Sequence, residues 1–228
     1  MNTDTNKWQR CFEKRIASEL EEQGHQDAAH DLSHVRRVWQ HCVRINEDDA
    51  LGVAPLVLLA AAYFHDIVNV PKNSKDRTQA SRMAAQRAII ILQSLDFPAE
   101  YFDEVRAAIE SHSYSANLKA ETPAAKIVQD ADRLEALGAL GIARVFYVAG
   151  QMNSKLFDAD DPWANERELN DKQYAIDHFF VKLLNIKNTM QTKTGRHLAE
   201  DLSIKMREYL EQFKHEISSA SESAALLN

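Results

Sequence analysis

Two adjacent side chains that could bind a metal ion, His65 and Asp66, end the most hydrophobic stretch of the chain, APLVLLAAAYFHDIVNV over residues 54–70. An imidazole and a carboxylate that are held out of water cost free energy unless a partner compensates them. A divalent cation is one such partner, because imidazole nitrogens and carboxylate oxygens are both common ligands. A metal site here would need further ligands from other parts of the sequence.

A second histidine segment lies upstream, in AAHDLSHVRRVW over residues 28–39. Asp31 is a suitable N-cap for a helix, and that helix would carry His34 and Arg37, three residues apart, on one face. His30 and Asp31 repeat the order of the doublet, but their polar surroundings favour a solvated helix start over a metal site.

Carboxylates also interrupt an apolar helical pattern in KIVQDADRLEALGALGIARVF, residues 126–146. Asp130, Asp132 and Arg133 lie there among Ile, Val and Leu at helical spacing. The two aspartates are two positions apart, which separates them by about 200° around a helix, so they should not face one metal ion together. Taken singly, each buried group could be a satisfied core residue. Three apolar helices that each deliver His or Asp instead favour a metal site within a helical bundle.

The composition is that of a globular protein and argues against several functions. The chain has 228 residues, of which 45% are hydrophobic and 27% charged, so it can form one well-packed domain. Its net charge of -7 argues against a surface for DNA or RNA, which requires a basic face. Cys11 and Cys42 match no zinc or redox spacing, so we expect reduced thiols and a cytoplasmic protein. No apolar run reaches the roughly 18 residues that span a bilayer, so we expect no membrane partner.

Helix-forming residues dominate the sequence, which has only 6 glycines and 5 prolines and no sustained strand alternation. This composition predicts an all-α fold. The predicted helices span 7–23, 32–49, 55–68, 76–95, 98–112, 123–149 with a break near Gly138, 172–190 and 195–219. Residues 150–171 combine Gly, Asn, Asp and Pro with Phe157 and Trp163, which predicts a long ordered loop that could be a lid or a binding loop.

The order of these segments resembles the HD-domain superfamily of metal-dependent phosphohydrolases, an all-α fold named for its His-Asp doublet. The resemblance covers roughly residues 25–215 and includes HDLSHVRRVW, YFHDIV followed by PKN, AKIVQDADRLEALGALGIARVF, YAIDHFFVKLL and GRHLAEDL. It points to the bacterial branch of these phosphohydrolases. It implies one compact HD domain over 25–215, an N-terminal helix within 1–24 that packs on it, and a frayed tail over 216–228.

The resemblance implies a set of metal ligands. His34, His65, Asp66 and Asp132 match the ligand positions, and Mn²⁺ is the expected ion, with Mg²⁺, Fe²⁺ or Co²⁺ as alternatives. Asp130 competes with Asp132 for the last position. If Asp132 is the ligand, Asp130 is expected to hold a histidine or an arginine in place from behind.

Other side chains are expected to act on phosphate. Arg37 and Arg133 would bind the substrate and neutralise charge in the transition state. Lys72, the best candidate in the KNSKDR stretch, is equally well explained as a phosphate ligand and as a solvated loop residue. His112 ends a predicted helix, where it could be a general acid, a phosphate ligand or simply a capping cation. The expected catalytic residues are therefore Asp66, Arg37, His112 and Arg133.

The function implied is hydrolysis of a nucleoside triphosphate to the monophosphate and pyrophosphate by attack of a metal-bound water. Asn69 and Val70 stand where alarmone hydrolases carry an acidic pair, and the glycine-tyrosine-proline signature of cyclic dinucleotide phosphodiesterases is missing, which makes both classes less favoured. A nucleotide phosphatase or phosphodiesterase and a non-catalytic nucleotide or metal sensor remain alternatives. The sequence leaves a homodimer open, and it favours His178 as a core or pocket-wall residue rather than a ligand.

Overall fold

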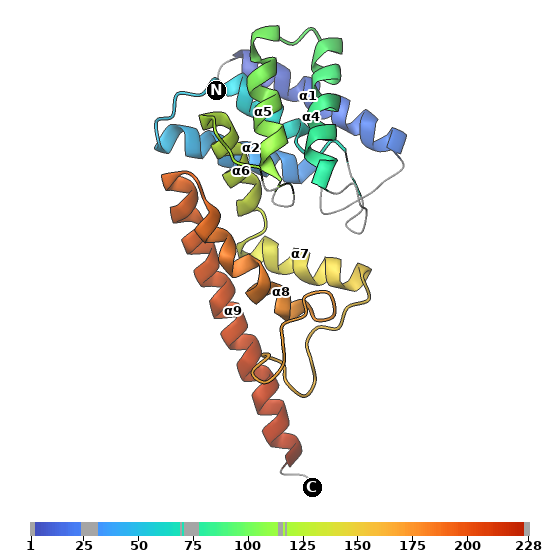
Figure 1. The fold of residues 1–228 in the computed structure, drawn as a ribbon, viewed down its shortest axis with the longest axis vertical. Coiled ribbons are helices and arrows are strands. Elements are labelled where there is room, and N and C mark those ends of the chain that lie inside the picture. The colour runs from blue at the N-terminus through green and yellow to red at the C-terminus, as the bar shows by residue number, and fades with distance from the viewer. Residues whose placement is uncertain are drawn as a thin grey trace. The chain divides into compact units, whose positions relative to one another are not determined.

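The computed structural model describes residues 3–23, 32–68, 70, 78–113, 116 and 118–225, and its regular elements are helices (Figure 1). The only β-type pairing among these residues is a single bridge between Lys155 and Tyr174, so the predicted all-α class is confirmed. The elements are α1 (Thr3–Gln23), α2 (Leu32–Asp48), α3 (Pro55–Phe64), α4 (Ala80–Ser94), η2 (Ala99–Tyr101), α5 (Phe102–His112), α6 (Pro123–Leu134), α7 (Gly138–Gln151), α8 (Ala175–Val181), η3 (Leu183–Thr189) and α9 (Lys193–Ala225).

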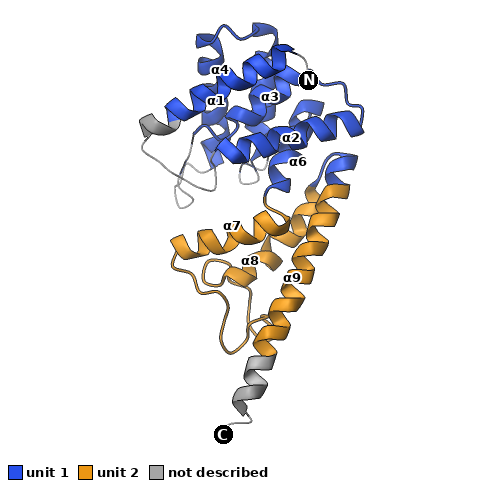
Figure 2. Cartoon of the chain, turned by 180° about the vertical axis from the view of Figure 1, so that it is seen from behind, with its two compact units in different colours: residues 1–135, 190–196 blue, residues 136–189, 197–228 orange. Residues whose placement is uncertain are grey.

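The helices form two compact units, which Figure 2 colours separately. The first unit comprises Met1–Glu135 together with Met190–Arg196, and the second comprises Ala136–Thr189 together with His197–Asn228. The expected domain range of 25–215 stays a prediction, because compactness alone does not decide which segments fold together.

The core of the first unit is α3, which is apolar on all sides. Eight of its ten residues are buried, as expected for a helix without a polar face. Helices α1, α2, α4, α5 and α6 all contact it. Pro55 occupies the first turn, where its missing N–H costs nothing. The segment that follows α3 therefore begins in the core of the first unit.

The predicted helix over 55–68 ends earlier than expected, at Phe64. The Ala62 carbonyl, which a longer helix would pair with the N–H of residue 66, accepts a hydrogen bond from Nδ1 of His65 at 2.9 Å. His65 and Asp66 therefore lie in the turn that follows the helix rather than on it.

The predicted break near Gly138 is confirmed. Helix α6 ends at Leu134, and α7 begins at Gly138 with a φ of +64°. A Cβ atom at this glycine would lie 2.7 Å from Cδ2 of Leu202, a side-chain end that can shift, so the positive φ is what favours glycine here. The other end of α6 is capped by Thr122, whose side chain accepts a hydrogen bond from the N–H of Ala125.

The N-terminal helix α1 is fastened to the first unit by two buried or half-buried carboxylates. Glu13 accepts hydrogen bonds from Arg36 at 2.7 and 2.8 Å and from the Tyr63 hydroxyl at 3.0 Å. Glu19, whose side chain is 3% exposed, accepts three hydrogen bonds from Arg87, at 2.8, 2.9 and 3.3 Å. These contacts join α1 to α2, α3 and α4.

The predicted ordered loop connects α7 to α8 in the second unit and is held by aspartates as well as by aromatic side chains. The Asp161 carboxylate accepts hydrogen bonds from the backbone N–H groups of residues 165, 166 and 167. Asp177, which is fully buried, binds the Arg167 guanidinium at 2.6 and 2.9 Å and the N–H of Asn170 at 2.6 Å. These charge-assisted hydrogen bonds fix the returning half of the loop.

The single helix predicted over 172–190 is wrong. Helix α8 begins only at Ala175, because the N–H of Ala175 and the carbonyl of residue 173 pair with the backbone of Lys155 at 2.9 Å each. It ends at Val181, and the 3-10 helix η3 follows. Of the two alternatives for His178, the core position is wrong, whereas the pocket-wall position stays a prediction. Its side chain is 31% exposed, and its Nδ1 lies 2.9 Å from the Asp171 carboxylate.

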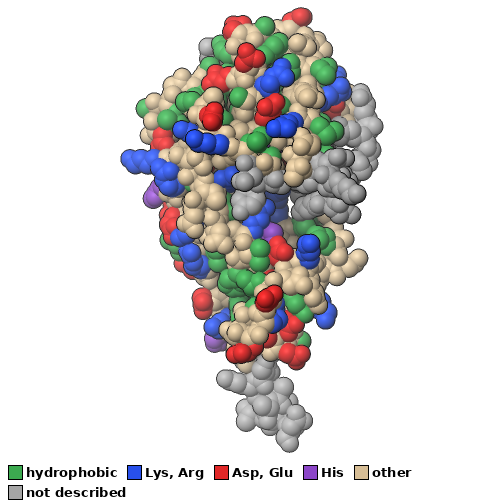
Figure 3. Space-filling model, in the orientation of Figure 1, with side chains coloured by type: hydrophobic (Ala, Val, Ile, Leu, Met, Phe, Trp, Pro, Cys, Tyr) green, Lys and Arg blue, Asp and Glu red, His purple; other side chains and the backbone are tan. Residues whose placement is uncertain are grey.

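The last helix, α9, continues to Ala225 and so extends beyond the predicted end at residue 219. The backbone of the predicted frayed tail over 216–228 is thus helical as far as residue 225. None of the helices described in this chain is long and apolar enough to cross a membrane. On the face drawn in Figure 3, acidic and basic side chains are interspersed, in keeping with the mixed charge of the sequence.

Candidate metal centre

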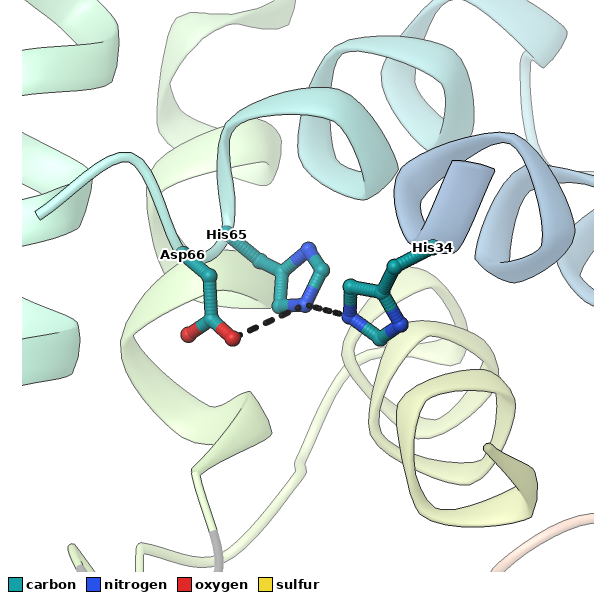
Figure 4. A group of neighbouring side chains, drawn as sticks. All are labelled: His34, His65 and Asp66. Carbon is teal, nitrogen blue, oxygen red and sulfur yellow. Dashed lines mark hydrogen bonds and ion pairs between the residues drawn. The ribbon is translucent and has the colours of Figure 1, made fainter. Parts of the chain in front are cut away.

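Four of the expected site residues converge in the first unit from three elements. His34 comes from the first turn of α2, His65 and Asp66 from the turn after α3, and Asp132 from the last turn of α6. Figure 4 shows three of them pointing toward one another. The imidazole side chains of His34 and His65 are 2% and 0% exposed, whereas those of Asp66 and Asp132 are 33% and 26% exposed. Buried nitrogens are thus combined with carboxylates that solvent can reach.

The distances within this group fit a metal centre. Nε2 of His34 lies 3.3 Å from Nε2 of His65 (Figure 4), and Oδ1 of Asp132 lies 3.7 and 3.6 Å from these two nitrogens. Oδ2 of Asp66 lies 3.6 Å from Nε2 of His65. A first-row ion with bonds of about 2.1 Å separates neighbouring ligand atoms by about 3.0 Å in an octahedral shell and about 3.4 Å in a tetrahedral one.

The outer hydrogen bonds of the histidines define which ring nitrogen faces the centre. Nδ1 of His65 bonds to the carbonyl of Ala62, and Nδ1 of His34 lies 3.3 Å from Oε2 of Glu135. A carbonyl and an ionised carboxylate can only accept, so both Nδ1 atoms must donate. In the neutral rings, both Nε2 atoms are therefore lone-pair acceptors, as metal ligation requires.

The electrostatics of the group are those of a cation site. Burial opposes the charged form of His65, but the carboxylates of Asp66 and Asp132 outweigh it and raise its pKa to about 9. Burial likewise opposes ionisation of Asp132, yet its hydrogen bond and charge interaction with His65 hold its pKa below the usual range. The pKa of His34 is lowered, chiefly by burial. The acceptors thus recruit positive charge, and a divalent ion would compete with the proton on His65.

His112, the last residue of α5, borders the same group. Its side chain is 4% exposed, and its Nε2 lies 3.3 Å from Oδ1 of Asp66. Its Nδ1 donates to the carbonyl of Ile109 at 2.6 Å, which is the helix-capping contact considered for it. Ligand atoms of His65, His112 and Asp132 also lie within 4.8 Å of one another. One ring thus caps α5 through Nδ1 and faces the cluster through Nε2, and a role of His112 as a general acid or phosphate ligand stays a prediction.

Sequence reasoning missed Glu135, which lies directly behind His34. The side chain is 2% exposed, and its carboxylate contacts His34, Arg37 and His41 on α2. Burial raises the pKa of Glu135, but these three donors together lower it to about 2, so the group is ionised. The sequence feature that could have identified Glu135 is its position three residues after Asp132, which places it one helical turn further on.

Asp130 differs from expectation. It is fully buried, and its carboxylate accepts hydrogen bonds from the N–H of Gln191 at 2.9 and 3.0 Å and from the N–H and hydroxyl of Thr192 at 2.7 Å each. A Cβ atom at Gly195 would lie 2.5 Å from Oδ2 of Asp130, so this contact also requires a glycine. Asp130 therefore anchors the start of α9, rather than a histidine or an arginine as expected.

The structure describes two of the three cations that are expected to bind phosphate. Arg37 is 33% exposed, and it donates from Nε to Glu135 at 2.8 Å and from Nη1 to Ser33 at 2.9 Å. Arg133 is half-buried and directly follows Asp132. Lys72 lies outside the described residues, as do His30 and Asp31.

Comparison with known proteins identifies the class to which this fold and this cluster belong. The family model of the HD domain matches residues 31–137, which contain all four candidate ligands. The chain belongs to the HD-domain family, as the resemblance of its motifs predicted.

Its relatives include bacterial proteins of similar length. YpgQ of Bacillus subtilis is 33% identical over 196 residues, which cover 84% of this chain and 86% of YpgQ. The crystal structure of YpgQ in complex with ADP superposes with a TM-score of 0.69 at 28% identity, covering 92% of this chain and 97% of that one. An HD-superfamily hydrolase from Bacillus thuringiensis superposes with the same TM-score, 0.69, at 26% identity, covering 93% and 97% of the two chains.

Proposed function

We propose that this chain is a metal-dependent phosphohydrolase that acts on nucleotides. The observation that carries the proposal is the convergence of ring nitrogens and carboxylate oxygens at a partly exposed position, where Nε2 of His65 lies 3.3 to 3.6 Å from atoms of His34, Asp66 and Asp132. Such a group of acceptors attracts positive charge, and its mixed nitrogen and oxygen shell suits Mn²⁺, Fe²⁺ or Co²⁺, with Mg²⁺ as a harder alternative. In this proposal His34, His65, Asp66 and Asp132 hold the ion. When bound, a divalent ion acidifies a water molecule and polarises a phosphoryl oxygen.

The remaining polar groups of the site have roles that suit a phosphate substrate. Arg37 retains Nη2 without a hydrogen-bond partner among the described residues, so it can bind an anion. Arg133 is the second proposed cation, and Lys72 is proposed as a third on the basis of the motif alone. Because the Nδ1 proton of His112 is committed to Ile109, its Nε2 is the atom that could exchange a proton with the substrate.

The proposed substrate is a nucleoside triphosphate, and the proposed products are the monophosphate and pyrophosphate. YpgQ, a relative with the same fold, was crystallised in complex with ADP, and the Bacillus thuringiensis relative is described as a hydrolase of the HD superfamily. These relatives support a nucleotide substrate and hydrolysis. Cleavage at the α-phosphorus is favoured because several cations can hold a polyphosphate tail and neutralise the pyrophosphate that leaves.

Two nucleotide analogues test where the phosphate chain is cut. With Mn²⁺ added, the β,γ-methylene triphosphate should still yield the monophosphate, whereas the α,β-methylene analogue should resist cleavage. The opposite pattern would indicate a phosphatase that removes the terminal phosphate, and consumption of monophosphates alone would also contradict the proposal. Tight nucleotide binding without any turnover would identify a sensor instead.

A matched pair of variants ties the reaction to the cluster. Asp66→Asn should lose both bound Mn²⁺ and activity, because an amide is a weak ligand for a hard cation. Asp48→Asn makes the same change at a side chain that is 52% exposed on α2 and pairs with Arg44, away from the cluster, so it should retain both. Full metal content in the Asp66 variant, measured by elemental analysis, would remove this residue from the ligand set.

A further inference from the structure

We infer that Glu135 is a positioning residue, which fixes the metal-binding tautomer of His34 and the orientation of Arg37 with one buried carboxylate. The inference rests on the metal centre proposed above and assigns a role to a residue outside its ligand set. Glu135 follows the last turn of α6 as its C-cap and is almost completely buried. A buried carboxylate is costly unless donors surround it, so its partners indicate what it is there to hold.

All three partners lie on one face of α2. Oε2 of Glu135 lies 3.3 Å from Nδ1 of His34 and 2.8 Å from Nε of Arg37, and Oε1 lies 3.5 Å from Nε2 of His41. Positions 34, 37 and 41 follow the spacing of neighbouring side chains on a helix surface. One carboxylate therefore contacts two successive turns of α2, and its Oε2 atom is shared by a proposed metal ligand and a proposed phosphate ligand.

The contact with His34 determines where the imidazole carries its proton. A neutral imidazole has one N–H, which in free solution exchanges between Nδ1 and Nε2. The Glu135 carboxylate accepts only, so it holds the proton on Nδ1 and leaves Nε2 as a lone pair 3.3 Å from Nε2 of His65. Without Glu135, the proton could move to Nε2 and block ligation. The negative charge behind the ring also makes Nε2 a stronger donor to a metal ion.

The contact with Arg37 restricts the guanidinium in a similar way. Glu135 binds Nε, and Ser33 binds Nη1 at 2.9 Å. These two contacts fix the plane of the Arg37 guanidinium before an anion binds. The long side chain therefore loses less rotamer freedom when it binds an anion. Because His34 and Arg37 share one oxygen, a change at Glu135 should disturb metal binding and substrate binding together.

Three substitutions separate a positioning role from a general effect on folding. Glu135→Met keeps the volume but removes the acceptor, and the half-exposed Arg37 and His41 can then reach water. We expect it to weaken Mn²⁺ binding by about 10- to 100-fold, the usual effect of losing an outer partner of a ligand. Glu135→Gln restores an acceptor and should recover most of the affinity. Glu135→Asp keeps the charge but shortens the reach to His34, so it should weaken Mn²⁺ binding even if the methionine variant fails to fold.

The control is Glu13→Met, the same chemical change at a carboxylate that binds Arg36, the neighbour of Arg37, from α1. It should lower the melting temperature but leave the affinity for Mn²⁺ unchanged, as measured by titration calorimetry. The direct readout is the nitrogen-15 spectrum of the histidine rings in metal-free protein. His34, assigned from a His34→Gln variant, should carry its proton on Nδ1 in the unmodified protein and on Nε2 in Glu135→Met.

The outcomes distinguish this inference from the proposed function. If the unmodified protein binds no Mn²⁺, the metal centre itself is wrong. If the unmodified protein binds Mn²⁺ and Glu135→Met binds it equally well with an unchanged His34 tautomer, the positioning role is overturned and the metal centre stands. Should Glu135→Met not fold, the same result in Glu135→Asp overturns the positioning role. Weakened binding with a shifted tautomer that the glutamine variant restores supports both.

Discussion

Asp130 and Asp132 lie on one helix, but replacing each by alanine should affect the protein in a different way, one through its stability and the other through its metal binding. Asp132 faces His34 and His65, whereas Asp130 accepts hydrogen bonds from Gln191 and Thr192. Asp132→Ala should therefore abolish metal binding and turnover with a small change in stability. Asp130→Ala should destabilise the protein and leave the metal-binding side chains in place.

The cost of Asp130→Ala follows from the donors that it leaves behind. Gln191 is exposed, so its N–H can bond to water, but Thr192 is only 5% exposed and loses the partner of both its N–H and its hydroxyl. An unsatisfied buried donor costs about 1 to 3 kcal/mol, so two of them cost about 4 kcal/mol. For a chain of this length, that loss corresponds to a fall in melting temperature of about 12 °C. Asp132 is 26% exposed, and Asp66 remains 3.6 Å from Nε2 of the buried His65 as a second acceptor, so replacing Asp132 should cost less than half as much.

Calorimetric melting of metal-free protein and elemental analysis after metal loading measure the two effects separately. The expected result is a large fall in melting temperature with metal retained for Asp130→Ala, and the reverse for Asp132→Ala. The assignment of the two carboxylates would be refuted if Asp130→Ala lost the metal at unchanged stability, or if Asp132→Ala kept full metal occupancy.

Two further predictions concern carboxylates away from the centre. The pKa of Glu13 is lowered chiefly by its hydrogen bond to Arg36, so this group stabilises the fold above its ordinary pKa of 4.5, and the contribution is lost as pH falls through the lowered value. In denaturant titrations, the free energy of unfolding of Glu13→Gln should therefore fall less steeply below that pH than that of the unmodified protein. Parallel plots of this free energy against pH for the two proteins would contradict the argument. Asp177→Ala removes the buried carboxylate that binds the half-buried Arg167 and the N–H of Asn170, so it should speed proteolysis between α7 and α8 several-fold. Unchanged cleavage at this loop would show that its aromatic contacts suffice.

Some features could be predicted from the sequence because they depend on residues a few positions apart. The all-helical class follows from propensity summed over long segments. The break between α6 and α7 follows from Gly138, whose positive φ favours glycine. The shared face of His34 and Arg37 follows from helical spacing, and both side chains do reach the same carboxylate oxygen.

The ends of elements were predicted less well, because local pattern does not record where the backbone hydrogen bonds go. The apolar run of α3 continues past Phe64, yet the His65 ring takes the Ala62 carbonyl and the helix stops. The start of α8 was missed for a similar reason, since pairing with Lys155 holds Tyr174, the residue before α8, extended. In both cases a tertiary or side-chain contact competed with helix continuation.

The composition of the centre depended on the tertiary structure more than on any pattern. Helical geometry in the sequence separates Asp130 from Asp132, but only packing decides which one meets the histidines and which one holds residues 191 and 192, more than 60 positions away. Glu135 reaches His34 across 101 positions. Spacing fixes the directions of side chains within one helix, whereas the relative placement of α2, α3 and α6 comes from burying the apolar sides of these helices together. The sequence thus determined which residues could bind a metal ion, and the packing of three helices decided which of them lie within reach of one another.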